Sequence, residues 1–309
     1  MKSTGIVKHF FHRLEYTCLW LFSAIMAAIP ESCVYMIARI LGGVAYHILR
    51  IRRDVTINNL RQALGGELSE AELEKIARRT YSNIGMTFIE VLLIPKLKSR
   101  IFEIVDMSDS FILKRNFDKG RGLILVSCHF SNWELNGASV AALGIPVSVV
   151  AKKQSNPYVD SYINGYRTGF GMKIIPPGVS IKHVVRALRE HEAVGLISDQ
   201  DAGKRGVFVD FFGRRASTPG GAAQLALKYG APIVVTMSIR TACGRYKSIF
   251  REVEVRENDT VEELTQRFTT IMEEVIRQNP EQYFWMHRRW KTRPPDNASR
   301  PGERLSHGY

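Results

Sequence analysis

A histidine and a glutamate stand five residues apart in the stretch VSCHFSNWEL, which occupies positions 126–135. A neutral imidazole can take a proton from an alcohol, while a carboxylate holds the second ring nitrogen and stabilises the imidazolium that forms. His129 and Glu134 are therefore candidates for a catalytic pair that activates a hydroxyl group. Cys128 is not expected to join them, because adjacent residues of a strand point to opposite faces.

The residues around this pair predict where it lies. Residues 122–127 (GLILVS) are typical of a strand buried on both faces. Ser131 followed by Glu134 has the spacing of a capping box that opens a helix, which places His129 beside the positive end of that helix. This helix end disfavours a protonated ring and keeps the imidazole available as a base. A plainer interpretation stays open, in which Glu134 only caps the helix and His129 is structural.

Apolar strand-like segments alternate with helical ones, which predicts an α/β fold with a mainly parallel sheet flanked by helices. Expected strands cover residues 123–127, 147–150, 172–175, 194–198 and 233–239, with an edge strand at 248–255. Expected helices cover residues 68–92, 111–117, 133–143, 181–190, 219–229 and 261–278. Ser69 with Glu72 forms a second capping box, and Thr218 with Pro219 is expected to open the helix at 219–229.

Two further polar residues are expected near the same sheet edge. Asp199 follows a predicted buried strand, so its side chain emerges where ligands bind in open α/β sheets. It is expected to bind polar groups of a substrate or to hold a partner in place. Arg167 follows a plausible helix and suits substrate phosphate or a developing oxyanion, unless it is an ordinary surface arginine. Residues 207–213 (VFVDFFG) are expected in the core or in the wall of an acyl groove.

Composition limits the partners. The formal net charge of +13 calls for an anionic partner, such as nucleic acid, anionic lipid or an acidic protein. No RNA-binding signature, zinc finger or basic heptad segment is present, so nucleic acid is not expected. The four cysteines are scattered without CxxC spacing, which argues against a zinc site or a disulfide framework. We expect no metal site, and no cofactor is expected either.

The N-terminal region predicts membrane attachment. Residues 16–29 carry no charge, residues 33–49 carry only Arg39, and neither run reaches the roughly 20 apolar residues that span a bilayer comfortably. Basic residues flank the region on both sides, which favours a hairpin or an interfacial anchor over a single span. We expect a membrane anchor at residues 1–50 and a cytoplasmic domain at 51–309. The alternative is a pair of core helices.

A basic segment rich in aromatic residues lies near the end of the chain, at positions 280–293 (PEQYFWMHRRWKTR). Such a segment can stack on nucleic acid or bind phosphates at a membrane surface. We expect its cations to add attraction to anionic lipid or to substrate phosphates. These cations are Arg288, Arg289, Lys291 and Arg293.

Four blocks together resemble the bacterial late acyltransferases of lipid A biosynthesis, the lauroyl/myristoyl transferase family. They are HFSNWE (the H-x4-D/E motif of that family), SDQDAGKRGVFVDFFG, STPGGAAQLALKYGAPIV and PEQYFWMHRRWKTRP. Their co-occurrence in this order is specific, and the resemblance covers nearly the whole chain. It implies a glycerolipid-acyltransferase-like fold behind a helical N-terminal anchor.

The resemblance also implies an activity and a location. Such enzymes lie at the bacterial inner membrane with a cytoplasmic active site. They move a fatty acyl chain from acyl carrier protein to a hydroxyl of a lipid A precursor of the Kdo-lipid IVA type. The catalytic residues of the family map onto His129 and Glu134. Arg167, Asp199 and Asn132 are the expected substrate-binding residues.

Two alternatives remain. The phosphate-binding F-P-E-G block of glycerol-3-phosphate-type acyltransferases is absent, which disfavours a glycerophosphate acceptor but leaves open another membrane glycolipid, such as a mannosylated phosphoinositide. The absence of a GxSxG elbow fits direct transfer without an enzyme nucleophile. A non-enzymatic alternative is a basic, membrane-peripheral lipid-binding protein in which His129 and Glu134 are structural.

Overall fold

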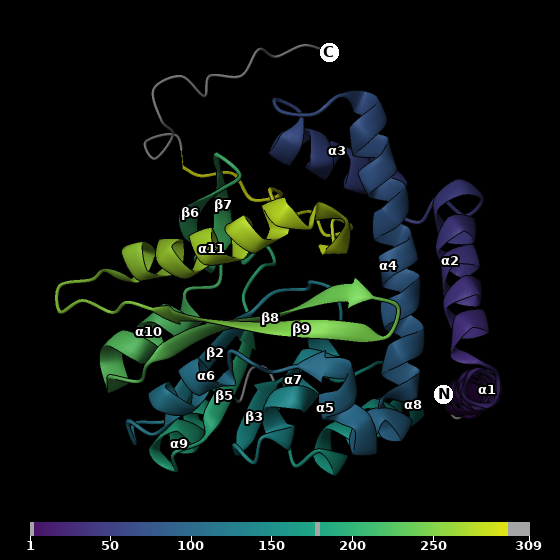
Figure 1. Cartoon of the computed structure of the whole chain (residues 1–309), viewed down its shortest axis with the longest axis horizontal. Coiled ribbons are helices and arrows are strands. Elements are labelled where there is room, and N and C mark those ends of the chain that lie inside the picture. Colours follow the sequence, from purple (N-terminus) through teal and green to yellow (C-terminus); the bar gives the residue numbers. More distant parts are fainter. Residues whose placement is uncertain (1–2, 177–179, 296–309) are drawn as a thin grey trace.

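A seven-stranded sheet forms the centre of the molecule in the computed structural model, which describes residues 3–176 and 180–295 (Figure 1). Its strand order is β1-β9-β8-β2-β5-β3-β4; β8 and β9 pair antiparallel and the other neighbours pair parallel. The predicted α/β fold with a mainly parallel sheet is therefore confirmed. The strands are β1 Val105–Asp106, β2 Leu123–Ser127, β3 Val147–Val150, β4 Lys173–Ile175, β5 Ala193–Ile197, β8 Ile233–Ala242 and β9 Arg245–Val253.

Helices cover the sheet, and the predicted ones agree with the observed ones to within a few residues. They are α1 Ser3–Ala28, α2 Glu31–His47, α3 Arg53–Leu64, α4 Glu70–Leu97, α5 Ile101–Ile104, α6 Ser110–Phe117, α7 Trp133–Ala142, α8 Pro157–Gly169, α9 Ser180–Arg189, α10 Gly221–Tyr229 and α11 Val261–Gln278. Short 3-10 helices lie at η1 Lys98–Arg100, η2 Gly203–Arg205 and η3 Pro280–Gln282.

Strand β2 shows why the core has two halves. Ile124 and Val126 belong to one apolar cluster, with residues of α10 and α11, whereas Leu123 and Leu125 belong to another, with residues of α6 and α7. Successive strand residues point to opposite faces, so a strand covered by helices on both sides must be apolar throughout. The unbroken apolar run that predicted this strand follows directly from its central place in the sheet.

The apolar stretch at residues 207–213 forms part of the core. It supplies β6 Val207–Phe211, which pairs antiparallel with β7 Arg214–Thr218 in a separate two-stranded sheet. Phe211 and Phe212 are buried in the same cluster as α11. Of the two expected positions for this stretch, the core is the observed one.

The predicted start of α10 was wrong. Thr218 is the last residue of β7, where it pairs with Val207, so it cannot cap the helix. Gly220 is the N-cap residue instead, without a side-chain cap, and the helix begins at Gly221. Ser69 does cap α4 through the predicted capping box with Glu72.

Helix α2 lies alongside α4, whereas α1, seen end-on in Figure 1, crosses the C-terminal end of α4. α2 approaches it closely: a Cβ added to Gly42 would lie 2.4 Å from the carbonyl oxygen of Tyr81. Ala38 and Tyr46 of α2 are fully buried. Part of the expected anchor region therefore packs into the body of the protein, while its outer face stays apolar and exposed.

Within residues 3–176 and 180–295, no helix is both long enough and apolar enough to cross a membrane.

A buried ion pair joins α4 to the sheet. Arg240 of β8 donates to Glu90 of α4 at 2.7 Å, and the two side chains are 5 % and 4 % exposed. Glu90 also accepts from the hydroxyl of Tyr246 and from Asn132 Nδ2, the latter at 3.1 Å. Arg240 makes a second bond, to Thr87 Oγ1 at 3.0 Å. The pair is therefore surrounded by hydrogen-bonding partners from three segments: β9, the N-cap of α7 and α4 itself.

Replacing Arg240 by methionine should strongly destabilise the protein, because it leaves Glu90 buried without its counter-charge. Breaking a buried pair in this way costs about 3–5 kcal/mol. Urea denaturation of Arg240→Met should show this loss in the free energy of unfolding. Arg251→Met removes an exposed arginine from β9 and should stay within about 0.5 kcal/mol of the wild type. Equal stability of the two variants would contradict the role given to the pair.

Candidate active site

His129 lies just beyond the carboxyl end of β2, and its partner is Asp199. The backbone N–H of His129 donates to Asp199 Oδ2 at 3.0 Å, and the ring Nδ1 lies 2.8 Å from Oδ1. β2 and β5 are parallel neighbours with Ser127 opposite Ile197, so the residues two positions further on meet at one sheet edge. Asp199 therefore holds the ring through Nδ1, which leaves Nε2 as the ring atom that can take a proton.

The expected contact between Glu134 and the ring of His129 was wrong. Arg167 of α8 takes the carboxylate of Glu134 in a two-pronged ion pair: its Nε donates to Oε2 at 3.0 Å, and its second terminal nitrogen donates to Oε1. Both side chains are largely buried. Such bidentate pairing fixes a carboxylate in place, so Glu134 acts on His129 only through its charge.

The charges around His129 decide its protonation. Burial lowers the pKa of its ring, but the charge and hydrogen bond of Asp199 and the charge of Glu134 outweigh burial and raise the pKa above its ordinary value. Burial raises the pKa of Asp199, but the charge and hydrogen bonds of His129 bring it below the usual range. The expectation that the helix end keeps the resting ring neutral was therefore incomplete, because two carboxylates act against it.

The expected capping box of α7 was also wrong. The N-cap residue is Asn132, whose side chain accepts from the backbone N–H of Leu135 at 3.0 Å. Ser131 takes a left-handed conformation with φ of 49°, and its backbone N–H donates to the carbonyl of Gln282. A residue in that conformation cannot serve as an extended N-cap. Glu134 is consequently free of capping and available to Arg167.

Asn132 has a structural position. Its side chain is fully buried; besides capping α7 it donates to Glu90, and it does not line the cavity at His129. The expected contact of Asn132 with a substrate therefore does not fit its surroundings. The same bonds connect the loop that carries His129 to the buried ion pair of α4 and β8.

A cavity of about 420 Å³ opens at His129 and runs between α7 and the sheet. Its polar end holds His129, Glu134 and Arg167, together with Lys152 and Gln154. Most of the remaining lining is apolar and includes Leu125, Gly137, Val140, Val147, Val149 and Met172; its polar members are Ser127, Asn136 and Thr236. The structure thus brings together His129, Glu134, Arg167 and Asp199 as expected: the first three line a space that suits a hydrocarbon chain, and Asp199 is buried behind His129.

Several residues at this site escaped the sequence analysis. Trp133 and Phe284 pack against the ring of His129, with centroid distances of 5.0 and 6.1 Å. Lys152 and Gln154 lie at the mouth of the cavity, just after β3. The end of the predicted strand at 147–150 was a usable signal for these two, since ligands bind beyond carboxyl strand ends. No local signal marked Phe284, because η3 brings it to His129 from the far end of the chain.

Only part of the basic segment at residues 280–293 lies at the surface of the protein. Arg289 is 2 % exposed and donates to the carbonyl of Ser217 at 2.6 Å and to the hydroxyl of Thr218. Its expected contribution to a basic surface was therefore wrong, because it fastens the segment to β7. Arg288, Lys291 and Arg293 are exposed.

Comparison with known proteins gives consistent matches. Residues 6–292 match the family model described as bacterial lipid A biosynthesis acyltransferase. The chain is 28 % identical over 290 residues to a lipid A biosynthesis lauroyltransferase of Escherichia coli (strain K12), covering 91 % of this chain and 92 % of the relative. It is 28 % identical over 287 residues to a palmitoleoyltransferase of the same pathway and strain, covering 91 % of each.

A more distant match is to a phosphatidylinositol mannoside acyltransferase of Mycolicibacterium smegmatis, 25 % identical over 182 residues, which covers 57 % of this chain and 59 % of the relative.

The contact between His129 and Asp199 predicts a shift in pH dependence. Asp199→Asn keeps the shape of the partner but removes its charge, so burial should bring the pKa of His129 down. A base works only when deprotonated, and the acidic limb of the pH–rate profile should therefore move to lower pH. The maximal rate should fall about 10²-fold or more, because the imidazolium loses its counter-charge.

The matched control is Asp201→Asn. Asp201 lies two residues further on and binds Thr292, without a bond to the ring of His129. Its substitution should leave the acidic limb in place. An unchanged limb in Asp199→Asn would exclude Asp199 as the group that sets the pKa.

Proposed function

Because the chain belongs to the bacterial lipid A biosynthesis acyltransferase family and is an acyltransferase, we propose that it moves a fatty acyl chain from acyl carrier protein to a hydroxyl of a lipid A precursor of the Kdo-lipid IVA type. The observation that carries this proposal is the position of His129, a carboxylate-held base that lines a cavity of about 420 Å³ with many apolar side chains in its wall. A hydrocarbon chain in that cavity brings its carbonyl carbon to the ring.

In the proposed mechanism His129 acts as general base. Its Nε2 takes the proton of the acceptor hydroxyl as the oxygen attacks the thioester carbonyl, and Asp199 stabilises the imidazolium that forms. The C–S bond breaks as the new C–O bond is completed, and the leaving thiolate takes the proton from His129. Arg167 lies at the same mouth, but its guanidinium is bound to Glu134 and to Asn164 Oδ1, the latter at 3.2 Å, so in this mechanism it holds Glu134 in place instead of contacting the substrate.

Charge supports the proposed donor. Acyl carrier protein is acidic, and the net charge of +13 attracts an acidic partner. Lys152 lies at the cavity mouth and Lys153 beside it is exposed, where a carrier protein would have to dock to deliver its chain. A second candidate acceptor is another membrane glycolipid, and the similarity to a phosphatidylinositol mannoside acyltransferase favours keeping it.

His129→Ala should lower the rate of acyl transfer from acyl carrier protein to a lipid A precursor by about 10²–10⁴-fold. The measurement is a transfer assay on the purified protein with mass detection of the product, alongside a thermal melt that should be unchanged. His47→Ala removes an exposed histidine at the end of α2 and should retain the full rate. Near-normal transfer by His129→Ala would eliminate the general-base mechanism, and no transfer by the wild type would eliminate the proposed donor or acceptor.

The proposed location is the bacterial inner membrane, with the catalytic domain in the cytoplasm and attachment through α1 and α2. The supporting observation is a row of exposed apolar side chains at helical spacing, a pattern typical of helices that lie in a membrane interface. On α1 they are Val7, Phe10, Phe11, Leu14, Trp20, Leu21 and Ile25; on α2 and just after it they are Met36, Ile40, Leu41, Ile48, Leu49 and Ile51.

Removing two of these rings should weaken attachment. The wild type should stay with vesicles of anionic phospholipid through a high-salt wash, because apolar burial is not screened by salt. The double variant Phe10→Ser with Trp20→Ser should come off in that wash. Phe102→Ser with Phe111→Ser removes two equally exposed rings outside α1 and α2 and serves as the control. If the α1 variant pelleted as firmly as the control, α1 would not be the anchor.

A further inference from the structure

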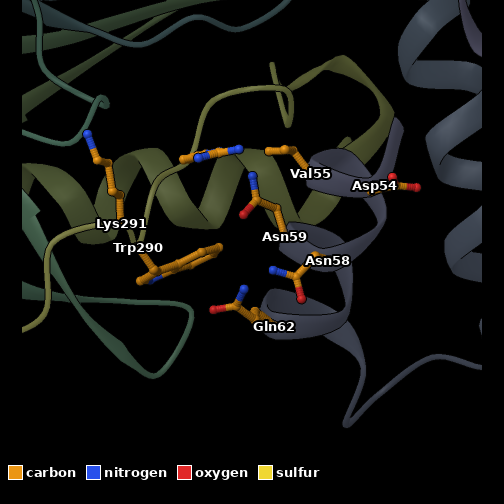
Figure 2. A pocket seen from close by; sticks show the side chains of 8 residues that line it. Asp54, Val55, Asn58, Asn59, Gln62, Trp290 and Lys291 are labelled. Atoms are coloured by element: carbon orange, nitrogen blue, oxygen red, sulfur yellow. The ribbon is translucent and has the colours of Figure 1, made fainter. Parts of the chain in front are cut away.

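A second cavity, of about 510 Å³, lies outside the His129 site, between α3 and the segment that follows η3 (Figure 2). The helix contributes amides, a carboxylate and an aliphatic side chain, whereas the segment contributes two cations and an indole. The lining residues are Asp54, Val55, Asn58, Asn59 and Gln62 of α3, and Arg288, Trp290 and Lys291 of the segment. None of these residues contributes to the lining of the cavity at His129.

The two walls are fixed to each other without a ligand. Asn59 Nδ2 donates to the backbone carbonyls of Trp285 at 2.7 Å and His287 at 2.6 Å, and Arg52 donates to the carbonyl of Met286. On α3, Asn58 and Gln62 stand four residues apart and so share one face of the helix. Figure 2 shows Trp290 facing Asn58, Asn59 and Gln62 across the space between the walls. The cavity is therefore preorganised.

Its polar groups lack partners. The side chains of Asn58, Gln62, Arg288 and Lys291 make no hydrogen bond or ion pair with any residue in the described ranges 3–176 and 180–295. Trp290 Nε1 is a buried donor without an acceptor in the same part of the chain. Many other arginines of the protein have a carboxylate partner, as Arg61 has in Glu70. The carboxylate of Asp54 also lines the cavity, but the two unpaired cations outnumber it, so with the two unpaired amides the cavity suits an anionic, hydrogen-bonding ligand.

The combination of groups selects a class of ligand. A guanidinium and an ammonium bind a carboxylate or a phosphate, and side-chain amides both donate to and accept from hydroxyl groups. The flat apolar face of an indole matches the C–H face of a pyranose ring, which is apolar on its face and polar at its rim. A bare phosphate would need neither the amides nor the indole, and a neutral sugar would not need the two cations.

We propose that this cavity binds an acidic sugar, a pyranose ring that carries a carboxylate or a phosphate. The inference rests on the proposed function for the source of the sugar, which would be the saccharide part of a glycolipid acceptor. One chain segment connects the two sites: Phe284 donates its backbone N–H to the carbonyl of His129 at 2.9 Å, and Trp290 follows six residues later. A glycolipid acceptor whose sugar is bound in this cavity is therefore held next to the chain segment that contacts His129.

A flat membrane surface fits these cations less well than a sugar does. Arg289, between them in sequence, is buried, so the segment does not present a continuous row of charge. Arg288 and Lys291 line a concave space together with amides and an indole. The exposed apolar rows that suit a membrane belong to α1 and α2 instead.

Titration calorimetry on the full-length protein tests binding directly. Glucuronate and glucose 6-phosphate should bind, while glucose and inorganic phosphate should bind at least about tenfold more weakly. The double variant Arg288→Ala with Lys291→Ala should bind both acidic sugars about tenfold or more weakly. Each of the two substitutions removes a charge-assisted contact to the acid group of the sugar. Both side chains are exposed and without bonds within the described residues, so the fold should be unaffected.

A matched control removes the same two charges elsewhere. Lys182→Ala with Arg189→Ala takes one lysine and one arginine from the surface of α9, which Figure 1 shows at the opposite end of the molecule from α3. This variant should bind the acidic sugars as the wild type does. Equal losses in the two double variants would reduce the effect to net charge and overturn the proposal.

Kinetics with the glycolipid acceptor separates positioning from catalysis. Arg288→Ala with Lys291→Ala should raise KM for the acceptor about tenfold or more and leave kcat within about twofold. An unchanged KM, or no binding of either acidic sugar at tens of millimolar, would overturn the proposal, as would tighter binding of adenosine monophosphate. Failure of the proposed function is distinguishable, because the wild type would then bind the sugars without transferring an acyl chain.

Discussion

The buried ion pair between Glu90 and Arg240 is the contact on which the assembly of this protein depends. It joins α4 to β8, and through Asn132 and Thr87 it also holds the loop that carries His129. Charges this deep are costly unless every remaining position finds a partner. Most of those positions are filled here by the hydroxyls of Tyr246 and Thr87 and the amide of Asn132. Because Tyr246 and Asn132 come from segments distant from α4, the pair is satisfied only when these segments are in place.

The two carboxylates of the active site, Asp199 and Glu134, have different roles. Asp199 is buried and bonded to His129 twice, so it orients the ring and raises its pKa. Glu134 is neutralised by Arg167 and acts at a distance, through a charge that its partner largely balances. Two acids of the same type take different roles because their environments differ. The Glu134–Arg167 pair also ties α7 to α8, and so fixes the two helices that border the mouth of the cavity.

The N-terminal helices pack against the body of the protein with one face and expose large apolar side chains on the other. The inner face of α2 is packed tightly enough on α4 that Gly42 has no room for a side chain. The outer faces of both helices expose large apolar residues, including Phe10 at 62 % and Ile48 at 72 %. α1 is further connected to α8, where Tyr162 bonds to Ser23 and Asn156 to the carbonyl of His12. The helix α1, whose outer face exposes large apolar side chains, is thus joined by hydrogen bonds to α8, the helix that carries Arg167.

The sequence by itself determined the elements and the edge where the site lies. Unbroken apolar runs identified β2 and β3 with their observed bounds, and the capping box at Ser69 marked the start of α4, because such signals depend on residues only a few positions apart. The same logic placed His129 and Asp199 at strand ends. It failed at α7 and α10, where a distant segment overrode the local cap: Gln282 binds the backbone of Ser131, and Thr218 is taken into β7.

Only the tertiary structure decided the partners. His129 pairs with Asp199 across 70 residues because β2 and β5 are neighbours in the sheet. Glu134 pairs with Arg167 because the fold brings the end of α8 to the start of α7. The spacing of five residues between His129 and Glu134 does not indicate which strands become neighbours in the sheet. The burial that sets the pKa of His129, and the docking of residues 283–291 on α3, likewise arise when the whole chain has folded. Contacts between residues far apart in sequence depend on topology, which no local pattern encodes.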